Sequence, residues 1–71
     1  MPDFQISLQA ARLNAGLTQK EVAQAMHVPR KTVDSWENGT LEPKISQGRQ
    51  LSELFRIPIE YIFLLSKSNN I

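Results

Sequence analysis

Apolar residues recur along the chain at helical spacing, in short stretches that are separated by glycine or proline. The separating residues divide the chain into five stretches, and they are Gly16, Pro29, Asn38-Gly39, Pro43 and Pro58. One continuous apolar run, Tyr61 to Leu65, lacks the alternation of a strand and has no hairpin partner. The pattern therefore predicts an all-α fold of five short helices.

The first two predicted helices span about Ile6 to Ala15 and Thr18 to Met26. On the first, one face at helical spacing holds Leu8, Ala11, Arg12 and Ala15. Gly16 can adopt the positive φ that ends a helix. Thr18 and Glu21 stand at the spacing of a capping box, which marks a helix start. The buried stripe of this second helix is predicted to hold Val22, Ala23 and Met26.

The third predicted helix spans Arg30 to Asn38, and only His27 and Val28 separate it from the second. It must therefore turn sharply away. Pro29 suits a helix start because no donor is needed there, and Asn38-Gly39 tolerates the left-handed conformation that ends a helix. The inward face is predicted to hold Val33, Trp36 and Glu37, and the outward face Arg30, Lys31, Asp34 and Ser35.

The last two predicted helices span about Lys44 to Phe55 and Ile59 to Leu65. Leu41 is expected to tuck into the core, together with Ile45, Leu51, Leu54, Phe55, Ile57, Ile59, Ile62 and Phe63. Gly48 costs ~1 kcal/mol inside a helix, so either the fourth helix starts later or the glycine lets another backbone approach. Residues 1–65 are expected to form one domain and residues 66–71 a flexible tail.

The composition of the chain argues against several kinds of chemistry. The 71 residues suffice for one small domain, and they include no cysteine and a single histidine, so we expect neither a metal site nor a cofactor. There is no catalytic Ser-His-Asp set, glycine-rich phosphate loop or carboxylate pair in an apolar pocket, so no enzymatic activity is expected. Without a membrane span or a signal-peptide pattern, a cytoplasmic location is the expectation.

Arg12 is unusual because it lies on an apolar helix face, where an unpaired charge is costly. Glu37 lies on the inward side of the third helix and is its natural partner. We therefore expect a structural ion pair between Arg12 and Glu37. The net charge of +1 says little about nucleic acid, since binding depends on where the charges lie.

Four short segments occur together at a specific spacing: Leu17-Thr18-Gln19-Lys20-Glu21-Val22-Ala23, Val28, Thr32-Val33 and Trp36-Glu37-Asn38-Gly39. In this combination they resemble the Xre family of phage repressor and Cro-like helix-turn-helix domains, over about Leu8 to Phe63. The resemblance implies a five-helix, lambda-repressor-like domain that binds double-stranded DNA. It further implies a transcriptional regulator, with repression the expected effect, of phage, plasmid or bacterial origin.

The resemblance also implies residue roles. The helix after Pro29 would lie in the major groove, with base-reading positions at Arg30, Lys31 and Ser35. The positions that match phosphate contacts are Thr18, Gln19, Lys20, Asn38 and Thr40, and the amides around Gly39 and Thr40 belong to the same phosphate clamp. Gln19 also matches a residue that braces the reading helix. Arginine and lysine suit the acceptors of guanine, and a helix N-terminus suits a phosphate. The plainer alternatives are that Lys20 and the Arg30-Lys31 pair are only solvated, and that His27 and Trp36 serve the turn and the core.

Several positions depart from the family pattern. His27 and Arg56 stand where glycine is usual, Pro29 and Pro58 where a capping serine is common, and Gly48 where leucine is usual. Histidine tolerates positive φ better than most residues, so the turn at His27 is expected to form. Each lost serine cap costs ~1 kcal/mol.

The working form is expected to be a homodimer through the C-terminal helix, because one reading helix covers only a few base pairs. Tyr61, Leu64 and Leu65 are apolar residues beyond what the inward face requires, although Leu64 or Leu65 could instead cover the domain's own core. No small-molecule effector is implied. The alternative function is a protein-interaction module of the same fold, such as an antitoxin or anti-repressor. A DNA binder differs from it by losing affinity steeply as salt rises.

Overall fold

A computed structural model describes residues 6–62 of the chain, and within this range it contains five helices and no strand. The helices are α1 (Leu8–Asn14), α2 (Gln19–Met26), α3 (Arg30–Asn38), α4 (Ile45–Phe55) and α5 (Ile59–Ile62). The predicted all-α fold is confirmed. The expected end of the fifth helix at Leu65 and the expected tail at residues 66–71 lie outside the described residues.

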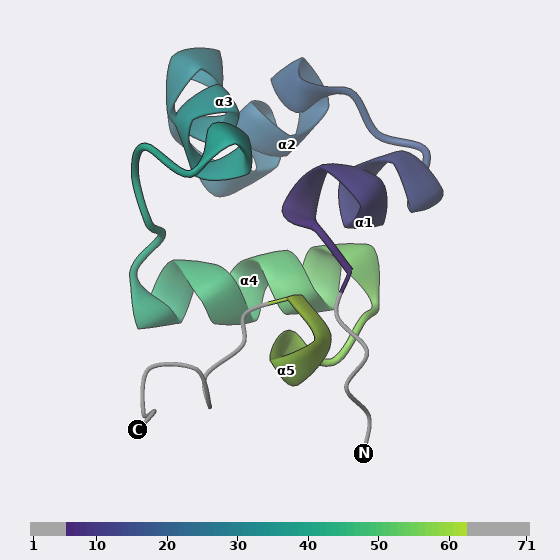
Figure 1. The fold of residues 1–71 in the computed structure, drawn as a ribbon. Coiled ribbons are helices and arrows are strands. Elements are labelled where there is room, and N and C mark those ends of the chain that lie inside the picture. Colours follow the sequence, from purple (N-terminus) through teal and green to yellow (C-terminus); the bar gives the residue numbers. More distant parts are fainter. Residues whose placement is uncertain (1–5, 63–71) are drawn as a thin grey trace.

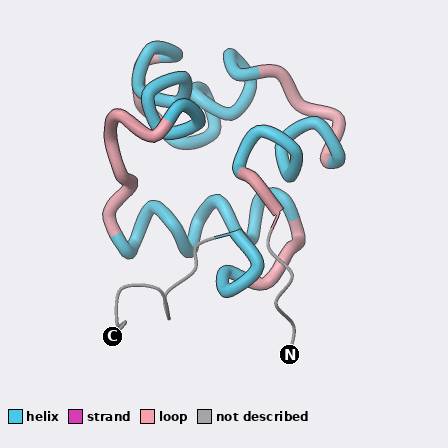
Figure 2. The backbone as a smooth tube through the Cα atoms, viewed as in Figure 1, coloured by secondary structure: helices cyan, strands magenta, loops and turns pink. Residues whose placement is uncertain are grey.

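The helices form two ends of one small body (Figure 1). α2 and α3 lie together at the top of the view, α4 crosses the opposite end, and α5 lies below α4. α1 lies between these two groups and packs against both α3 and α4. Figure 2 shows the long connection from α3 to α4, which contrasts with the tight turn between α2 and α3. The α2–α3 pair is therefore displayed at the end away from α5.

The core draws on every helix. Its most deeply buried large side chains are Val22, Val33 and Leu51, which come from α2, α3 and α4. The buried apolar set is Leu8, Ala11, Val22, Ala23, Met26, Val33, Trp36, Leu51, Phe55 and Ile62. The stripe predicted for α2 is confirmed, whereas Ala15 is exposed because α1 ends before it.

The helix ends follow local sequence. The Thr18 side chain accepts from the Glu21 backbone N–H while the Glu21 side chain accepts from that of Thr18, so the capping box forms. His27 adopts the left-handed conformation with φ 59°, which makes the short turn into α3 possible. α3 has no side-chain cap at Pro29 and ends at Gly39, where φ is 83°.

Two residues expected in the core are exposed. Leu41 is 49% exposed and Ile45 is 75% exposed, so both expectations were wrong. Ile45 is the first residue of α4. Side chains lean toward the N-terminus of their helix, so that of Ile45 projects beyond the helix start instead of onto the core. The backbone N–H of Leu41 donates to the carbonyl of Ser35, which ties this residue to the end of α3.

Gly48 lies inside α4 and is buried, and its φ is not positive. Of the two alternatives for this glycine, a later start of the fourth helix was wrong, because the helix begins at Ile45. The buried position agrees with the other alternative, close approach by a neighbouring part of the fold. No helix within residues 6–62 has the length and apolar character needed to cross a membrane.

Candidate nucleic-acid interface

The outward face of α3 carries charged side chains at its start. Arg30, Lys31 and Asp34 are exposed, whereas Ser35 is only half-exposed. Val33 and Trp36 are buried on the opposite face and anchor the helix to the core. Because the opposite face packs on the core, the first turn of α3 exposes two cationic side chains.

The start of α2 lies beside this surface. The hydroxyl of Thr18 accepts from the Glu21 N–H, and the Thr18 backbone N–H donates to the Glu21 carboxylate. The capping box therefore uses both polar groups of Thr18. The backbone N–H groups of Gln19 and Lys20 come first in the helix and have no acceptor within it. These two amides are the donors that the α2 N-terminus offers to an anion.

Gln19 connects α2 to α3 through both ends of its side-chain amide. Arg30 Nη1 donates to Gln19 Oε1 at 2.8 Å. Gln19 Nε2 donates to Glu37 Oε1 at 3.0 Å and to Asp34 Oδ1 at 3.3 Å. The expected phosphate contact Gln19 and the expected base reader Arg30 are thus hydrogen-bonded to each other.

Arg12 and Glu37 form the expected ion pair. Arg12 Nε lies 2.6 Å from Glu37 Oε2, and the two side chains are 9% and 6% exposed. Arg12 Nη2 also donates to Glu37 Oε1 at 3.3 Å, while Nη1 donates to the carbonyl of Leu17 at 2.9 Å. The guanidinium of α1 therefore fastens α3 and the turn that precedes α2.

The turn after α3 is closed by its own hydrogen bonds. The backbone N–H groups of Gly39, Thr40 and Leu41 all donate to the carbonyl of Ser35. Asn38 Oδ1 accepts from the Thr40 backbone N–H at 3.0 Å and from the Thr40 hydroxyl at 2.8 Å. The amides expected to clamp a phosphate are already bonded, so the side-chain amide nitrogen of Asn38 is the donor that remains.

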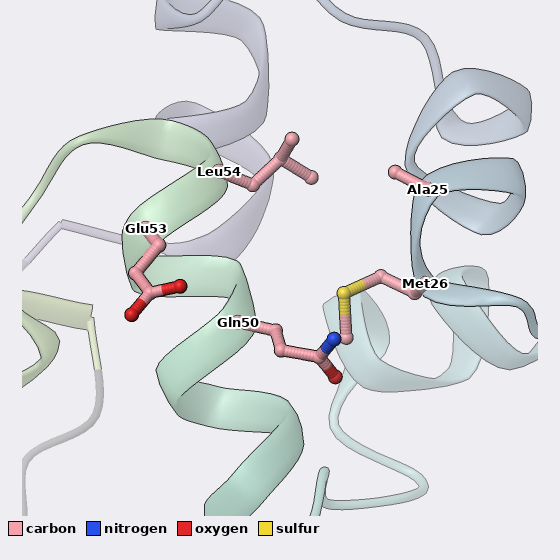
Figure 3. Close-up of a pocket in the computed structure, with 5 residues that line it drawn as sticks. All are labelled: Ala25, Met26, Gln50, Glu53 and Leu54. Atoms are coloured by element: carbon pink, nitrogen blue, oxygen red, sulfur yellow. The ribbon is translucent and has the colours of Figure 1, made fainter.

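A groove of about 290 Å³ lies between α2 and α4. Figure 3 shows the residues that line it, which are Ala25, Met26, Gln50, Glu53 and Leu54. None of the expected site residues lines it. The candidate interface is instead formed by the start of α2, the start of α3 and the turn after α3.

Sequence reasoning placed these residues on one surface but missed two features of it. Gln19 was expected to brace the reading helix and does contact it, but its partners Arg30 and Glu37, which lie 11 and 18 residues away along the chain, were not foreseen. Nor was it foreseen that the loop amides bond internally. The first depends on how α2 packs against α3, and helical spacing within either helix carries no signal for that.

Known proteins resemble this chain in sequence. The helix-turn-helix family model matches residues 8–62. The HTH-type transcriptional activator BcrR of Enterococcus faecalis is 29% identical over 58 residues, which are 82% of this chain and 28% of the relative. The cryptic phage CTXphi transcriptional repressor RstR of Vibrio cholerae is 29% identical over 66 residues, which are 93% of this chain and 60% of the relative. No solved structure gives a significant match.

Proposed function

The chain belongs to the helix-turn-helix family, and from that premise we propose that it binds double-stranded DNA sequence-specifically and regulates transcription. The observation that carries the proposal is the exposed pair Arg30 and Lys31 on the first turn of α3, beside the N-terminus of α2. The chain covers more of the relative named a repressor than of the one named an activator, so repression is the proposed effect. Such a regulator works in the bacterial cytoplasm, and the domain has no catalytic role.

In this proposal α3 enters the major groove. An α-helix is ~10–12 Å across and the groove is ~12 Å wide, so the helix fits into the groove. Arg30 and Lys31 donate to base edges, where guanine offers two acceptors. Ser35 follows one turn later and makes the next contact. Its partial burial limits it to a base that comes close to the helix.

The phosphate contacts come from both sides of α3. The backbone N–H groups of Gln19 and Lys20, together with the Lys20 ammonium, bind one phosphate at the N-terminus of α2. The Asn38 side-chain nitrogen binds another. Thr18 and Thr40 support these contacts indirectly, since their polar groups are bonded to Glu21 and Asn38.

The protein-interaction alternative receives less support from α3. A helix face that binds a protein partner exposes apolar anchors, whereas the exposed residues at the start of α3 are Arg30, Lys31 and Asp34. Large exposed apolar residues occur elsewhere in residues 6–62, at Leu13, Leu41, Ile45 and Tyr61. We propose that the DNA-bound form is a homodimer through the C-terminal helix, to which Tyr61, 37% exposed, belongs.

The experiment is selection of duplexes from a random pool with the purified protein, followed by affinity measurements at several salt concentrations. We expect one enriched site whose affinity falls steeply with salt, because phosphate contacts release counterions. Arg30→Ala should cost ~1–3 kcal/mol on that site and relax preference at one base pair. Lys20→Ala is the matched control and should weaken binding to all sequences alike. No enrichment, or affinity independent of salt, would overturn the proposal in favour of a protein partner.

A further inference from the structure

One chain of hydrogen bonds joins the core to the reading surface. It begins at Arg12 on α1, passes through Glu37 on α3 and Gln19 on α2, and ends at Arg30 on α3. Two of these residues are buried side chains of an ion pair, and Arg30 is exposed. The side-chain amide of Gln19 connects the buried ion pair to the exposed Arg30.

The partners of Gln19 leave its amide one orientation. An ionised carboxylate only accepts hydrogen bonds and a guanidinium only donates them. The NH2 end must therefore face Glu37, and the oxygen must face Arg30. Turning the amide over would put an oxygen against a carboxylate and a donor against a guanidinium, so both contacts would become repulsive.

Glu37 is the fixed point of this arrangement. Arg12 holds its carboxylate by two N–H groups, one on each oxygen, and such forked pairs restrict both position and angle. The side chain is 6% exposed, so water does not compete for it. Asp34 also accepts from Gln19, but over 3.3 Å and from an exposed position. The buried carboxylate is the stronger constraint.

We propose that Glu37 is a positioning residue for base recognition: it orients the Gln19 amide, which holds the Arg30 guanidinium ready to read one base pair. The inference rests on the proposed DNA-binding function. Guanidinium has five N–H groups, and the bond to Gln19 uses one of them. Enough donors remain for a two-point contact with guanine, which is made without first ordering a long side chain.

The test removes the fixed carboxylate without leaving a buried charge. Arg12→Met combined with Glu37→Leu replaces the ion pair by apolar side chains, an exchange that folded proteins often tolerate. The readout is a discrimination ratio, the affinity for the selected site divided by the affinity for a site changed at the base pair read by Arg30. A good contact gives the wild type a ratio of roughly 5- to 150-fold. In the double variant the ratio should fall about 2- to 10-fold, the effect of losing one preordered side chain.

Two further variants separate positioning from general loss of structure. Arg12→Met with Glu37→Gln keeps an oxygen that can accept from Gln19, and should restore most of the ratio. Asp34→Ala removes the outer acceptor and should change the ratio little. In the free protein, NMR relaxation of the Gln19 side-chain NH2 should show an ordered group in the wild type. The same group should be mobile in the double variant that carries Glu37→Leu.

The outcomes distinguish the inference from the function on which it rests. If the wild type enriches no duplex, the proposed function fails and the inference fails with it. A second outcome is that the wild type discriminates between the two sites, Arg30→Ala does not, and the double variant keeps the full ratio. This result would overturn the positioning role alone. A ratio abolished by Asp34→Ala alone would overturn it as well, by assigning the orientation of Gln19 to the outer carboxylate. If the double variant fails to fold, the Glu37→Gln variant and the wild-type NMR measurement decide: a ratio lost in the Glu37→Gln variant, or a mobile Gln19 NH2 group in the wild type, would overturn the positioning role.

Discussion

The carboxylate of Glu37 has three hydrogen bonds and little contact with water. Arg12 supplies two of these bonds and the opposite charge. Removal of either partner leaves the other as an uncompensated buried charge, whereas removal of both leaves none. The loss of one partner should therefore destabilise the fold far more than the loss of both.

Arg12→Met alone is expected to lower the free energy of unfolding by ~3–5 kcal/mol, because Glu37 then remains buried and unpaired. Arg12→Met with Glu37→Leu is expected to recover most of that loss. Urea denaturation of both variants and the wild type measures the difference. Equal stability of the single and double variants would show that the charge of Glu37 is well solvated and contradict the burial seen here.

The sequence predicted the ion pair between Arg12 and Glu37, but not the hydrogen bonds that connect it to Gln19. Arg12 and Glu37 both occupy inward positions at helical spacing, and two opposite charges facing one core must meet. Gln19 is half-buried on a different helix. Its contacts depend on how α2 and α3 cross, and a polar residue at a helix start is equally compatible with solvent.

Among the elements, α2 and α3 depend on left-handed residues at their ends. His27, with φ 59°, caps the end of α2, and Gly39, with φ 83°, caps the end of α3. The left-handed region costs a residue with a side chain ~1–2 kcal/mol, while glycine loses ~0.5–1 kcal/mol more entropy on folding. The steric cost is the larger of the two, so glycine is favoured at both positions.

His27→Gly is accordingly expected to raise the free energy of unfolding by ~0.5–1 kcal/mol, the difference between those two costs. Gly39→Ala is the converse change and should lower it by a similar amount. A Cβ at Gly39 meets no atom within 4 Å, so the effect there is one of backbone conformation alone. Thermal and urea unfolding of the two variants test the pair. A loss of stability in His27→Gly would mean that the imidazole itself contributes to the turn.

Element boundaries near α4 were the part of the fold least accessible from sequence. Ile45 is apolar and occupies a helix, which predicts burial, but the first turn of α4 extends past the core. The backbone N–H of Leu41 donates to the carbonyl that closes the end of α3, and its side chain is exposed. Gly48 takes a core-facing position without a side chain. Each outcome depends on neighbours from other helices, which periodicity within one segment does not describe.

The helices proposed to read DNA and the helix proposed to form the dimer lie at opposite ends of the molecule. The α2–α3 pair lies at one end and α5 at the other (Figure 1). In the proposed homodimer, two copies of α3 read half-sites about 34 Å apart, one turn of the duplex. A dimer interface at the C-terminal helix, away from α2 and α3, leaves both reading helices free for the DNA.

Leu65→Glu is expected to lower cooperativity on a palindromic site and leave the domain folded. Leu65 lies outside residues 6–62, and its assignment rests on the apolar surplus of the sequence. Ile45→Glu is the matched control, an exposed apolar position on α4. Sedimentation with and without the duplex measures the stoichiometry. A strict one-to-one complex at saturation would exclude the dimer, and cooperativity lost only in Ile45→Glu would move the interface to the start of α4.

The carbonyl of Ser35 accepts from three successive backbone amides. This arrangement affects how fast their protons exchange with solvent. Exposed turns ordinarily exchange their amide protons with solvent quickly, each residue independently. Here the protons of Gly39 and Leu41 are released when the last turn of α3 opens, so these two should exchange at one common, slowed rate. The Thr40 N–H also donates to Asn38 Oδ1, so its proton should exchange more slowly than theirs. The common rate of Gly39 and Leu41 therefore measures how often the end of the proposed reading helix frays.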